Sequence, residues 1–467
     1  MTREAVARRT DCGADDGAGD QVGAACADGQ IAFSTGAGDQ IRAAFADRQI
    51  AFSTGAGDQV RAACAARRAR LLAQLPPGAV AVLHTAPEVA RNGDSHYPYR
   101  YDSGFYYLTG FTEPESALVL VAARGDAPAR SVLFCRAKNP DREIWDGFRY
   151  GPEAARAAFG FAEAYPIEDL DGALAQLRAG AAAEPVDLLP LLADMRLLKD
   201  DSEQATMQRA ATISALAHVR AMQHARAGMH EYEIEAELLY EFRRHGAQGQ
   251  AYPPIVAAGA NACVLHYSAN NALARDGDLV LVDAGCELDG YASDITRTWP
   301  VNGRFTAPQR QLYELVLAAQ SAALRAVVPG RPYAGIHAAA LDVLAQGMLD
   351  LGLLDKNTCG SAADVIADKR HLQFYMHGTG HWLGLDVHDV GAYRDLSVAD
   401  HPSRALQAGM VLTVEPGIYV RPAAGVPEQF WNTGIRIEDD VLVTATGHTV
   451  LSAAAPKSVA DIEKLML

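Results

Sequence analysis

Apolar and polar positions between residues 62 and 198 predict short helices and strands that follow one another. The helical spacing in RAACAARRARLLAQL ends at the helix-breaking PPG, and the next segment, AVAVLHTA, is typical of a strand. SALVLVAA and SVLFCRA predict two more strands, and EAARAAFG predicts a helix. This alternation predicts an α/β domain over residues 62–198.

The pattern changes near residue 199, where longer helices begin. SEQATMQRAATISALAHVRAMQHA predicts a long amphipathic helix, with Ser202 as its N-cap. Further helical segments alternate with strongly apolar strands: EYEIEAELLYEFRRHG, APQRQLYELVLAAQSAALRAV and GIHAAALDVLAQGMLDLG. We therefore predict a second domain over residues 199–467 and an α+β fold class for the chain.

Residues 1–61 differ from both domains. QIAFSTGAGDQ occurs at residues 30–40 and again, unchanged, at residues 49–59, and a shorter copy, GAGDQV, begins at Gly17. These copies hold too little apolar surface to offset the entropy lost on ordering the chain. We interpret residues 1–61 as a low-complexity extension, predicted to be disordered, that arose by duplication of coding DNA or by an upstream start codon.

Composition narrows the classes of function. The 467 residues are 49% apolar and carry a formal net charge of −16, which argues against nucleic acid as a partner because phosphate binding needs a basic surface. No apolar run approaches the ~20 residues that span a bilayer, and no secretory signal is visible at the start. The cysteines are scattered, and we expect Cys263 and Cys286 to be buried apolar side chains. These features predict a cytoplasmic enzyme without a membrane partner.

The segments LVLVDAG and SDITRTW predict two strands of a hairpin joined by an Asp-Gly turn. If Asp289 and Gly290 are the central turn residues, Asp283 lies opposite Thr296 and Asp294 is its diagonal neighbour on the same face. Asp283 directly follows the apolar run LVLV, where an unpaired carboxylate would be costly. The register therefore favours a paired functional role for Asp283 and Asp294 over simple solvation of a hairpin.

Three later motifs supply further chemistry. HGTGHWLGLDVHD contains His377, His381 and His388 among glycines, and LTVEPG places Glu415 at the end of an apolar strand. In GIRIEDD, alternation puts Arg436 and Glu438 on one face, where an arginine would keep a ligating carboxylate ionised and oriented. We expect the next two residues to be solvated or turn residues rather than metal ligands: Asp439 and Asp440.

Four carboxylates and one imidazole form an oxygen-rich donor set, which suits hard or borderline divalent cations such as Mn²⁺. The set is Asp283, Asp294, His381, Glu415 and Glu438. Four negative charges can neutralise two such cations, and a hydroxide that bridges two metal ions is a nucleophile at neutral pH. The sequence thus predicts a metal-dependent hydrolase.

At these motifs the chain resembles the Xaa-Pro aminopeptidases (aminopeptidase P), in the peptidase family that also holds prolidase, methionine aminopeptidase and creatinase. The resemblance covers roughly residues 65–465 and includes APEVARNGDSHYPYRYDSGFYYLTGFTEPESALVLV and REIWDG as well as the metal motifs. It implies a C-terminal pita-bread catalytic domain preceded by a smaller α/β domain. It also implies two divalent ions per subunit, with Mn²⁺ expected, and a homodimer or homotetramer.

The resemblance also implies roles for individual residues. Asp283 would be a ligand of one ion, Asp294 and Glu438 would bridge both ions, and His381 and Glu415 would complete the shell of the other. Glu415 would also accept a proton from the attacking water. The remaining residues would bind the substrate or stabilise the reacting carbonyl: His266, His377, His388, Tyr419, Arg436 and Trp145, the last contributed by a neighbouring subunit.

The chain departs from the family pattern at two places. Ser103-Gly104-Phe105 stands where an acidic residue is expected, and RDLSVADHPSRALQAGM adds residues before LTVEPG that could alter access to the pocket.

The function implied is release of the N-terminal residue from peptides with proline in second position, through a hydroxide that bridges two metal ions. Prolidase is the nearest alternative, because it shares every ligand and accepts only Xaa-Pro dipeptides. A methionine aminopeptidase fits less well, since those chains usually lack the N-terminal domain. A metal-free, creatinase-like hydrolase or a peptide-binding protein would lack the metal ligands, all of which this chain retains.

Overall fold

The computed structural model describes residues 54–180 and 186–467. The repeats at residues 17–53 lie outside this range, but the end of the second copy does not. Helix α2 (Thr54–Leu72) begins before the predicted boundary at Ala62, so residues 54–61, assigned by us to a disordered extension, are helical. The expectation of disorder was wrong for these residues.

The N-terminal part contains a mixed sheet of four strands in the order β1-β4-β5-β6. The first three strands pair antiparallel, and β6 joins β5 in parallel. The sheet strands and the helices around them are β1 (Val80–His84), β4 (Ala117–Val121), β5 (Arg130–Cys135), β6 (Glu163–Pro166), α3 (Ser103–Thr109), α4 (Pro140–Asp146), α5 (Gly151–Phe159), α6 (Leu170–Gly180) and α7 (Leu189–Leu197), and a small hairpin is formed by β2 (Ala90–Asn92) and β3 (Ser95–His96). The strands predicted from AVAVLHTA, SALVLVAA and SVLFCRA and the helix predicted from EAARAAFG are all present.

Helix α8 (Asp201–His224) opens the C-terminal part, and its cap differs from the prediction. Asp200, rather than Ser202, is the N-cap, and its side chain accepts hydrogen bonds from the backbone N–H groups of Ser202 and Glu203. Both residues are good caps by type. Asp200 is favoured because its carboxylate also pairs with Arg67 at 2.6 Å, a contact that the local sequence does not reveal.

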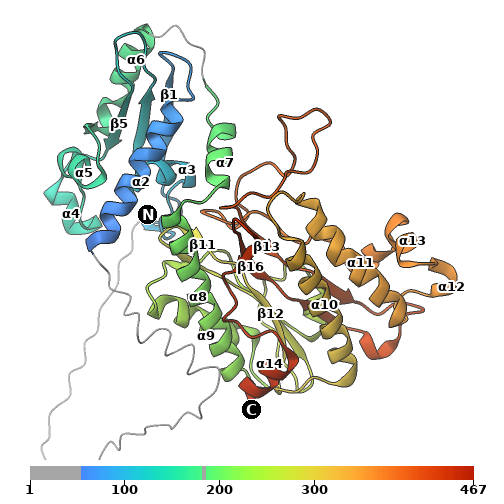
Figure 1. Ribbon diagram of the computed structural model, residues 1–467. Coiled ribbons are helices and arrows are strands. Elements are labelled where there is room, and N and C mark those ends of the chain that lie inside the picture. Colours follow the sequence, from blue (N-terminus) through green and yellow to red (C-terminus); the bar gives the residue numbers. More distant parts are fainter. Residues whose placement is uncertain (1–53, 181–185) are drawn as a thin grey trace, which may run out of the picture. The chain divides into compact units, whose positions relative to one another are not determined.

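The C-terminal strands form several small antiparallel sheets. They lie between the helix pair α8 and α9 and the helix pair α10 and α11 (Figure 1). The elements are α9 (Glu231–Arg244), β7 (Gly249–Gln250), β8 (Ile255–Ala258), β9 (Leu279–Asp283), β10 (Cys286–Leu288), β11 (Tyr291–Ala292), β12 (Thr296–Pro300), α10 (Ala307–Ala326), α11 (Ala334–Asp350), α12 (Lys356–Cys359), α13 (Ala362–Ala367), β13 (Val411–Val414), β14 (Gly417–Val420), β15 (Thr433–Arg436), β16 (Asp439–Val443), β17 (His448–Val450) and α14 (Val459–Met466).

Strand β9 is central in its sheet, with β8 on one side and β12 on the other. Its apolar run LVLV is buried throughout, as a strand packed on both faces requires. Cys263 and Cys286 are buried free thiols, as predicted.

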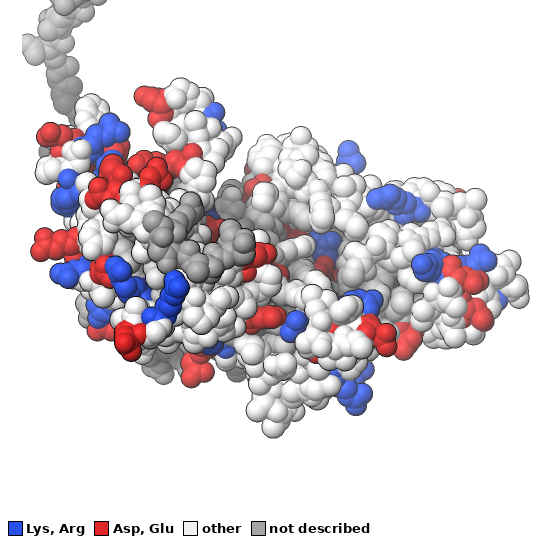
Figure 2. Space-filling model, turned by 90° about the horizontal axis from the view of Figure 1, so that it is seen from above, with Lys and Arg blue, Asp and Glu red and all other residues white. Residues whose placement is uncertain are grey.

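On the face shown in Figure 2, basic and acidic side chains are interspersed rather than gathered into one patch of a single sign. Within the described ranges, no helix has the length and apolar character that crossing a bilayer requires.

Candidate metal centre

The hairpin between β9 and β12 has the predicted register. Asp283 pairs with Thr296, and Leu288 pairs with Tyr291 across the turn. The central turn residues, Asp289 and Gly290, have φ angles of 49° and 81°, the left-handed region that Asp and Gly tolerate best. Asp283 and Asp294 therefore share one face, and this prediction is confirmed.

Tyr252 joins the two carboxylates and was missed by sequence reasoning. Its hydroxyl donates to Asp283 Oδ1 at 2.6 Å and also contacts Asp294 Oδ1. Burial and the two negative charges raise the pKa of Tyr252 well above its ordinary value, so the phenol stays protonated as a donor. The segment AYPP around it carries no signal of this role.

Three side chains offer one ligand atom each within 4.8 Å of one another: Asp294, His381 and Glu438. His381 Nε2 lies 3.3 Å from Asp294 Oδ2. His381 Nδ1 lies 3.0 Å from the Trp382 carbonyl oxygen, a contact that favours a proton on Nδ1 and leaves Nε2 to ligate. Burial would lower the pKa of His381, but Asp294 and Glu415 outweigh it and raise the pKa to about 9.

Glu415 faces the same cluster from the end of β13. Its carboxylate oxygens lie 3.8 Å from His381 Nε2 and 3.8 Å from His377 Nδ1. Its backbone N–H donates to the Thr379 carbonyl at 2.8 Å, which ties it to the histidine segment. Burial is the main cause that raises the pKa of Glu415 to about 7, a value suited to a proton acceptor near neutral pH.

The charge of this cluster fits bound cations. Burial, together with Asp294, Glu415 and Asp283, raises the pKa of Glu438 well above its ordinary value. Arg436 faces Asp283, Glu415 and Glu438. When all four carboxylates are ionised, their negative charge exceeds the positive charge of Arg436 and a protonated His381. Divalent cations bound by oxygen ligands would offset this excess, and the residues present therefore fit a metal site.

Arg436 stands where it can orient two of the carboxylates. Its Nη2 donates to Asp283 Oδ2 at 2.6 Å, and its Nε donates to Thr296 Oγ1 at 3.1 Å. Thr296 in turn donates to Glu438 Oε2 at 2.6 Å. Arg436 is 4% exposed, so these charge-assisted bonds are protected from solvent.

The other histidines border the cluster. The ring of His388 stacks on that of His381 with centroids 3.9 Å apart. His377 Nε2 lies 2.8 Å from the Tyr419 hydroxyl, which also accepts from Arg436 Nη1 at 3.0 Å. The pKa values of His377 and His388 are lowered, first by burial and in part by His266, which lies near both.

Trp145 is not brought to this cluster. It lies on α4 and is 82% exposed, so within one chain it contacts none of the ligands. Its predicted place in the pocket wall therefore requires a second subunit.

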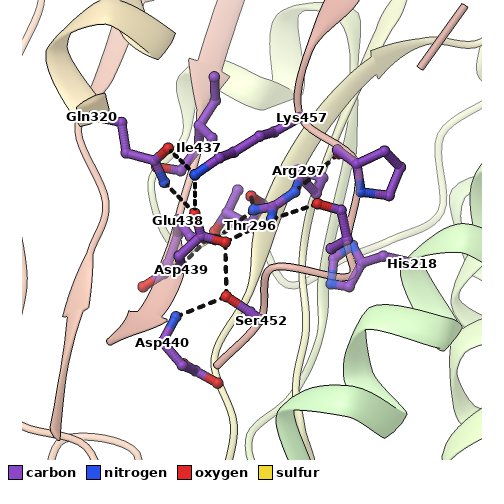
Figure 3. A network of polar contacts seen from close by, with 12 residues as sticks. His218, Thr296, Arg297, Gln320, Ile437, Glu438, Asp439, Asp440, Ser452 and Lys457 are labelled. Atoms are coloured by element: carbon purple, nitrogen blue, oxygen red, sulfur yellow. Dashed lines mark hydrogen bonds and ion pairs between the residues drawn. The ribbon is translucent and has the colours of Figure 1, made fainter. Parts of the chain in front are cut away.

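Asp439 and Asp440 are not solvated, and our prediction for them was wrong. Both are buried on β16. Asp439 pairs with Arg297 at 2.6 Å and with Lys457, as Figure 3 shows. Asp440 accepts from Ser293 Oγ at 2.7 Å and from the backbone N–H of Asp294 at 3.0 Å. Adjacent acidic residues in sequence resemble a solvated turn, and their buried partners come from distant segments.

Arg297 links Asp439 to the ligand strands. Its Nη1 donates to the backbone carbonyls of Thr296 and Glu438, so one fully buried guanidinium fastens β12 to the segment that carries Glu438 (Figure 3).

A cavity of about 500 Å³ borders the histidine segment at Gly378–Gly380. Arg394 and Ser403, which also line it, pair with each other as an isolated bridge within the additional residues before LTVEPG. The additional loop therefore reaches a cavity beside the candidate site.

Comparisons with known proteins agree with this geometry. Residues 205–445 match Metallopeptidase family M24, and residues 64–185 match the N-terminal domain of aminopeptidase P. The Xaa-Pro aminopeptidase of Haemophilus influenzae is 44% identical over 86% of this chain and 96% of its own length.

Two solved structures have the same fold. Aminopeptidase PepP of Pseudomonas aeruginosa is 45% identical with a TM-score of 0.82, over 87% of this chain and 98% of its own. Aminopeptidase P of E. coli with the inhibitor Pro-Leu is 43% identical with the same score and coverage. The pita-bread fold implied by the resemblance is confirmed, and the chain belongs to the aminopeptidase P group of metallopeptidase family M24.

Proposed function

We propose that this protein is an Xaa-Pro aminopeptidase, which hydrolyses the bond before a proline in second position and releases the N-terminal residue. The convergence of Asp283, Asp294, His381, Glu415 and Glu438, drawn from separate motifs, carries the proposal. The similarity to Xaa-Pro aminopeptidases over most of the chain supports the substrate class.

We propose that these five side chains hold two divalent ions, with Mn²⁺ expected from the oxygen-rich donor set. When bound, the ions supply Lewis acidity and a water of lowered pKa. Glu415, whose carboxylate lies 3.8 Å from His381 Nε2 at the edge of the cluster, accepts the proton of the attacking water. Arg436 holds Asp283 in place through its 2.6 Å bond.

We assign the histidines and Tyr419 to the binding of the substrate. His388 donates a hydrogen bond to the developing oxyanion, and His266 and His377 line the path of the peptide. Such a donor contributes ~10²–10³-fold to the rate. An Xaa-Pro bond is a tertiary amide without an N–H, so an apolar wall rather than a hydrogen-bond acceptor suits the proline ring.

A substitution of Glu415 tests the catalytic assignment. Glu415→Ala should leave less than a tenth of the wild-type rate on an Xaa-Pro-Xaa peptide, with the circular dichroism spectrum unchanged. Glu428→Ala, which removes an exposed glutamate, is the matched control and should keep full activity. A Glu415→Ala protein that retains more than a tenth of the rate would contradict the assignment.

The length of the peptides that are cleaved distinguishes an Xaa-Pro aminopeptidase from a prolidase. A panel of Xaa-Pro and Xaa-Pro-Xaa peptides, assayed with and without added Mn²⁺, should show cleavage of the longer peptides and dependence on metal. Cleavage of dipeptides alone would instead identify a prolidase.

A homodimer or homotetramer in the cytoplasm remains our proposal. Trp145, Ile144 and Phe148 are at least 65% exposed on or next to α4, which supports a neighbouring subunit as their cover. Sedimentation equilibrium would find a monomer if this is wrong. We also retain the division into residues 62–198 and 199–467 as a proposal, with the start of the first domain moved to residue 54 or earlier because α2 begins there.

A further inference from the structure

The segment that carries His388 is attached to side chains from outside the catalytic motifs. Arg196, on α7, donates from Nη2 to Asp386 Oδ2 at 2.7 Å and to Asp389 Oδ1. Lys199 Nζ donates to Asp389 Oδ2 at 3.0 Å. Asp386 and Asp389 flank His388 in sequence.

Burial makes these contacts strong constraints. The side chains of Arg196, Lys199 and Asp389 are at most 7% exposed. Arg196 and Lys199 face Asp386 and Asp389, and Arg100 Nη2 lies 3.9 Å from Asp386 Oδ1. Removing Arg196 would leave the buried Asp389 with one cation instead of two. The positions of Asp386 and Asp389 are therefore tied to α7 and to Lys199, which lies between α7 and α8.

Residues of the N-terminal part add a second attachment. Ser103 Oγ donates to Asp386 Oδ1 at 2.6 Å, and Arg100 Nη2 donates to the Leu385 carbonyl at 2.7 Å. Gly384 lets the chain pass close by, because a Cβ there would lie 2.1 Å from Asp389 Oδ2. The segment from Gly384 to Asp389 is thus fixed around His388.

Within the segment from Gly384 to Asp389, His388 is exposed, and its ring stacks on that of His381 in the metal cluster. The clamp residues Arg196, Lys199, Asp386 and Asp389 pair with one another, and Asp386 also lies 3.9 Å from Arg100. These pairs include none of the residues of the metal cluster. A change in the clamp should therefore move His388 more than it moves the metal.

We propose that Arg196 and Lys199 are positioning residues that set the place of His388 through Asp386 and Asp389. This inference rests on the proposed function, since it assigns His388 a part in the reaction. The N-terminal part and the connecting segment thus contribute to catalysis without contacting substrate.

A double-mutant cycle tests the proposal. Arg196→Met, His388→Ala and the double variant are each loaded with Mn²⁺ and assayed for kcat and KM on an Xaa-Pro-Xaa peptide. Arg196→Met alone should lower kcat by about 10- to 100-fold, the cost of a displaced catalytic group. In the His388→Ala background the same change should lower kcat by less than about three-fold, because the positioned group is already gone.

Two further readouts exclude a general loss of structure. Metal content per chain, measured by mass spectrometry, should match the wild type in all variants. Arg68→Met is the matched control. Arg68 is similarly buried, donates to the carbonyls of Leu108 and Gly160 and lies over the ring of Phe161, all within the N-terminal part. It should lower the melting temperature while leaving kcat within about two-fold of wild type.

The outcomes of the cycle distinguish a failure of the clamp proposal from a failure of the proposed function. Equal losses from Arg196→Met with and without His388 would overturn the clamp and leave the proposed function standing. An unchanged kcat in His388→Ala would overturn both the role of His388 and the clamp. If Arg196→Met does not fold, Asp386→Asn, a change at a partly exposed carboxylate, replaces it in the same cycle with an expected loss of about five-fold.

Discussion

The two halves of the metal centre are held in place by different kinds of structure. Asp283, Asp294 and Glu438 lie on or next to paired strands, where ladder hydrogen bonds and the register fix them. His377, His381 and His388 lie in a segment that forms no strand of its own. It borders β13 through the bridge between Trp382 and Leu412 and through backbone hydrogen bonds at Thr379, His381 and Leu383.

This difference determines what supports each half. We call the part with Asp283, Asp294 and Glu438 the strand half and the histidine segment the loop half. The ion pairs of Asp439 with Arg297 and Lys457 support the strand half (Figure 3). In the loop half, the backbone hydrogen bonds to β13 lie at Thr379–Leu383. The part around His388 is held by side chains far away in sequence, through Asp386 and Asp389. We expect defects in the first half to appear as lost stability and defects in the second as lost turnover.

The largest effect should come from the strand half. Arg297→Met leaves Asp439 buried with one cation instead of two and removes the donors to Thr296 and Glu438. The free energy of unfolding should fall by about 3–5 kcal/mol, as for other broken buried ion pairs. Urea denaturation measures it.

Arg310→Met is the control, since it breaks an exposed pair with Glu314 on α10, and its urea midpoint should not shift measurably. A loss below about 1 kcal/mol in Arg297→Met would show that the network does not support the strands.

The pH dependence of stability gives a second test of the strand half. His218 on α8 lies with Nε2 3.0 Å from the Ala284 carbonyl, next to Asp283, and burial lowers its pKa to about 4. Because the folded-state pKa is below the ordinary 6.5, its contribution to stability is complete above pH 6.5 and is lost as the pH falls toward 4. The loss attributable to this group by pH 4 is about 3 kcal/mol.

The matched variant is His218→Gln, whose side-chain amide can donate to the Ala284 carbonyl but has no titratable group. Urea unfolding between pH 4 and pH 7 should show a shallower dependence for the variant. Parallel curves for the two proteins would exclude His218 as the group responsible.

Sequence reasoning recovered the strand half better than its supports. The apolar run before Asp283 and the Asp-Gly turn determine a register with period two, so Asp294 and Thr296 could be placed without coordinates. Tyr252 could not, because its phenol meets Asp283 from a segment with no pattern. Asp439 looked solvated because Arg297, which buries it, is 142 residues away.

In the loop half too, sequence reasoning missed the contacts between residues that are distant in sequence. The histidines of HGTGHWLGLDVHD were recognised by their density among glycines, whereas Arg196 and Lys199 lie at the predicted boundary between the two domains and belong to no motif. Their partner Asp389 is more than 180 residues away. Local patterns give the elements and the ligand motifs, but pairing between distant charges depends on the completed fold.

Alanine substitutions at two glycines compare the rigidity of the strand half with that of the loop half. Gly285 lies in the β9–β12 hairpin, and a Cβ there would lie 1.6 Å from the Ser293 backbone carbonyl oxygen, which cannot rotate away. Gly285→Ala should therefore cost about 2–3 kcal/mol of stability, the range of overpacking that forces backbone shifts. Thermal unfolding followed by circular dichroism measures it, and an unchanged melting temperature would contradict the rigid ladder.

Gly384→Ala places the same methyl group in the loop half, where it meets the side-chain oxygen of Asp389 instead of backbone. A carboxylate can rotate where a backbone carbonyl cannot, but the rotation weakens buried ion pairs. The stability cost should therefore be about 2 kcal/mol, no larger than that of Gly285→Ala. That rotation takes Asp389 away from Lys199 and Arg196, and we expect kcat to fall about ten-fold with metal content unchanged. Kinetics and calorimetry are measured on the same preparation. A large stability loss with normal turnover would show that the histidine segment is as rigid as the strands and that turnover does not depend on the clamp residues.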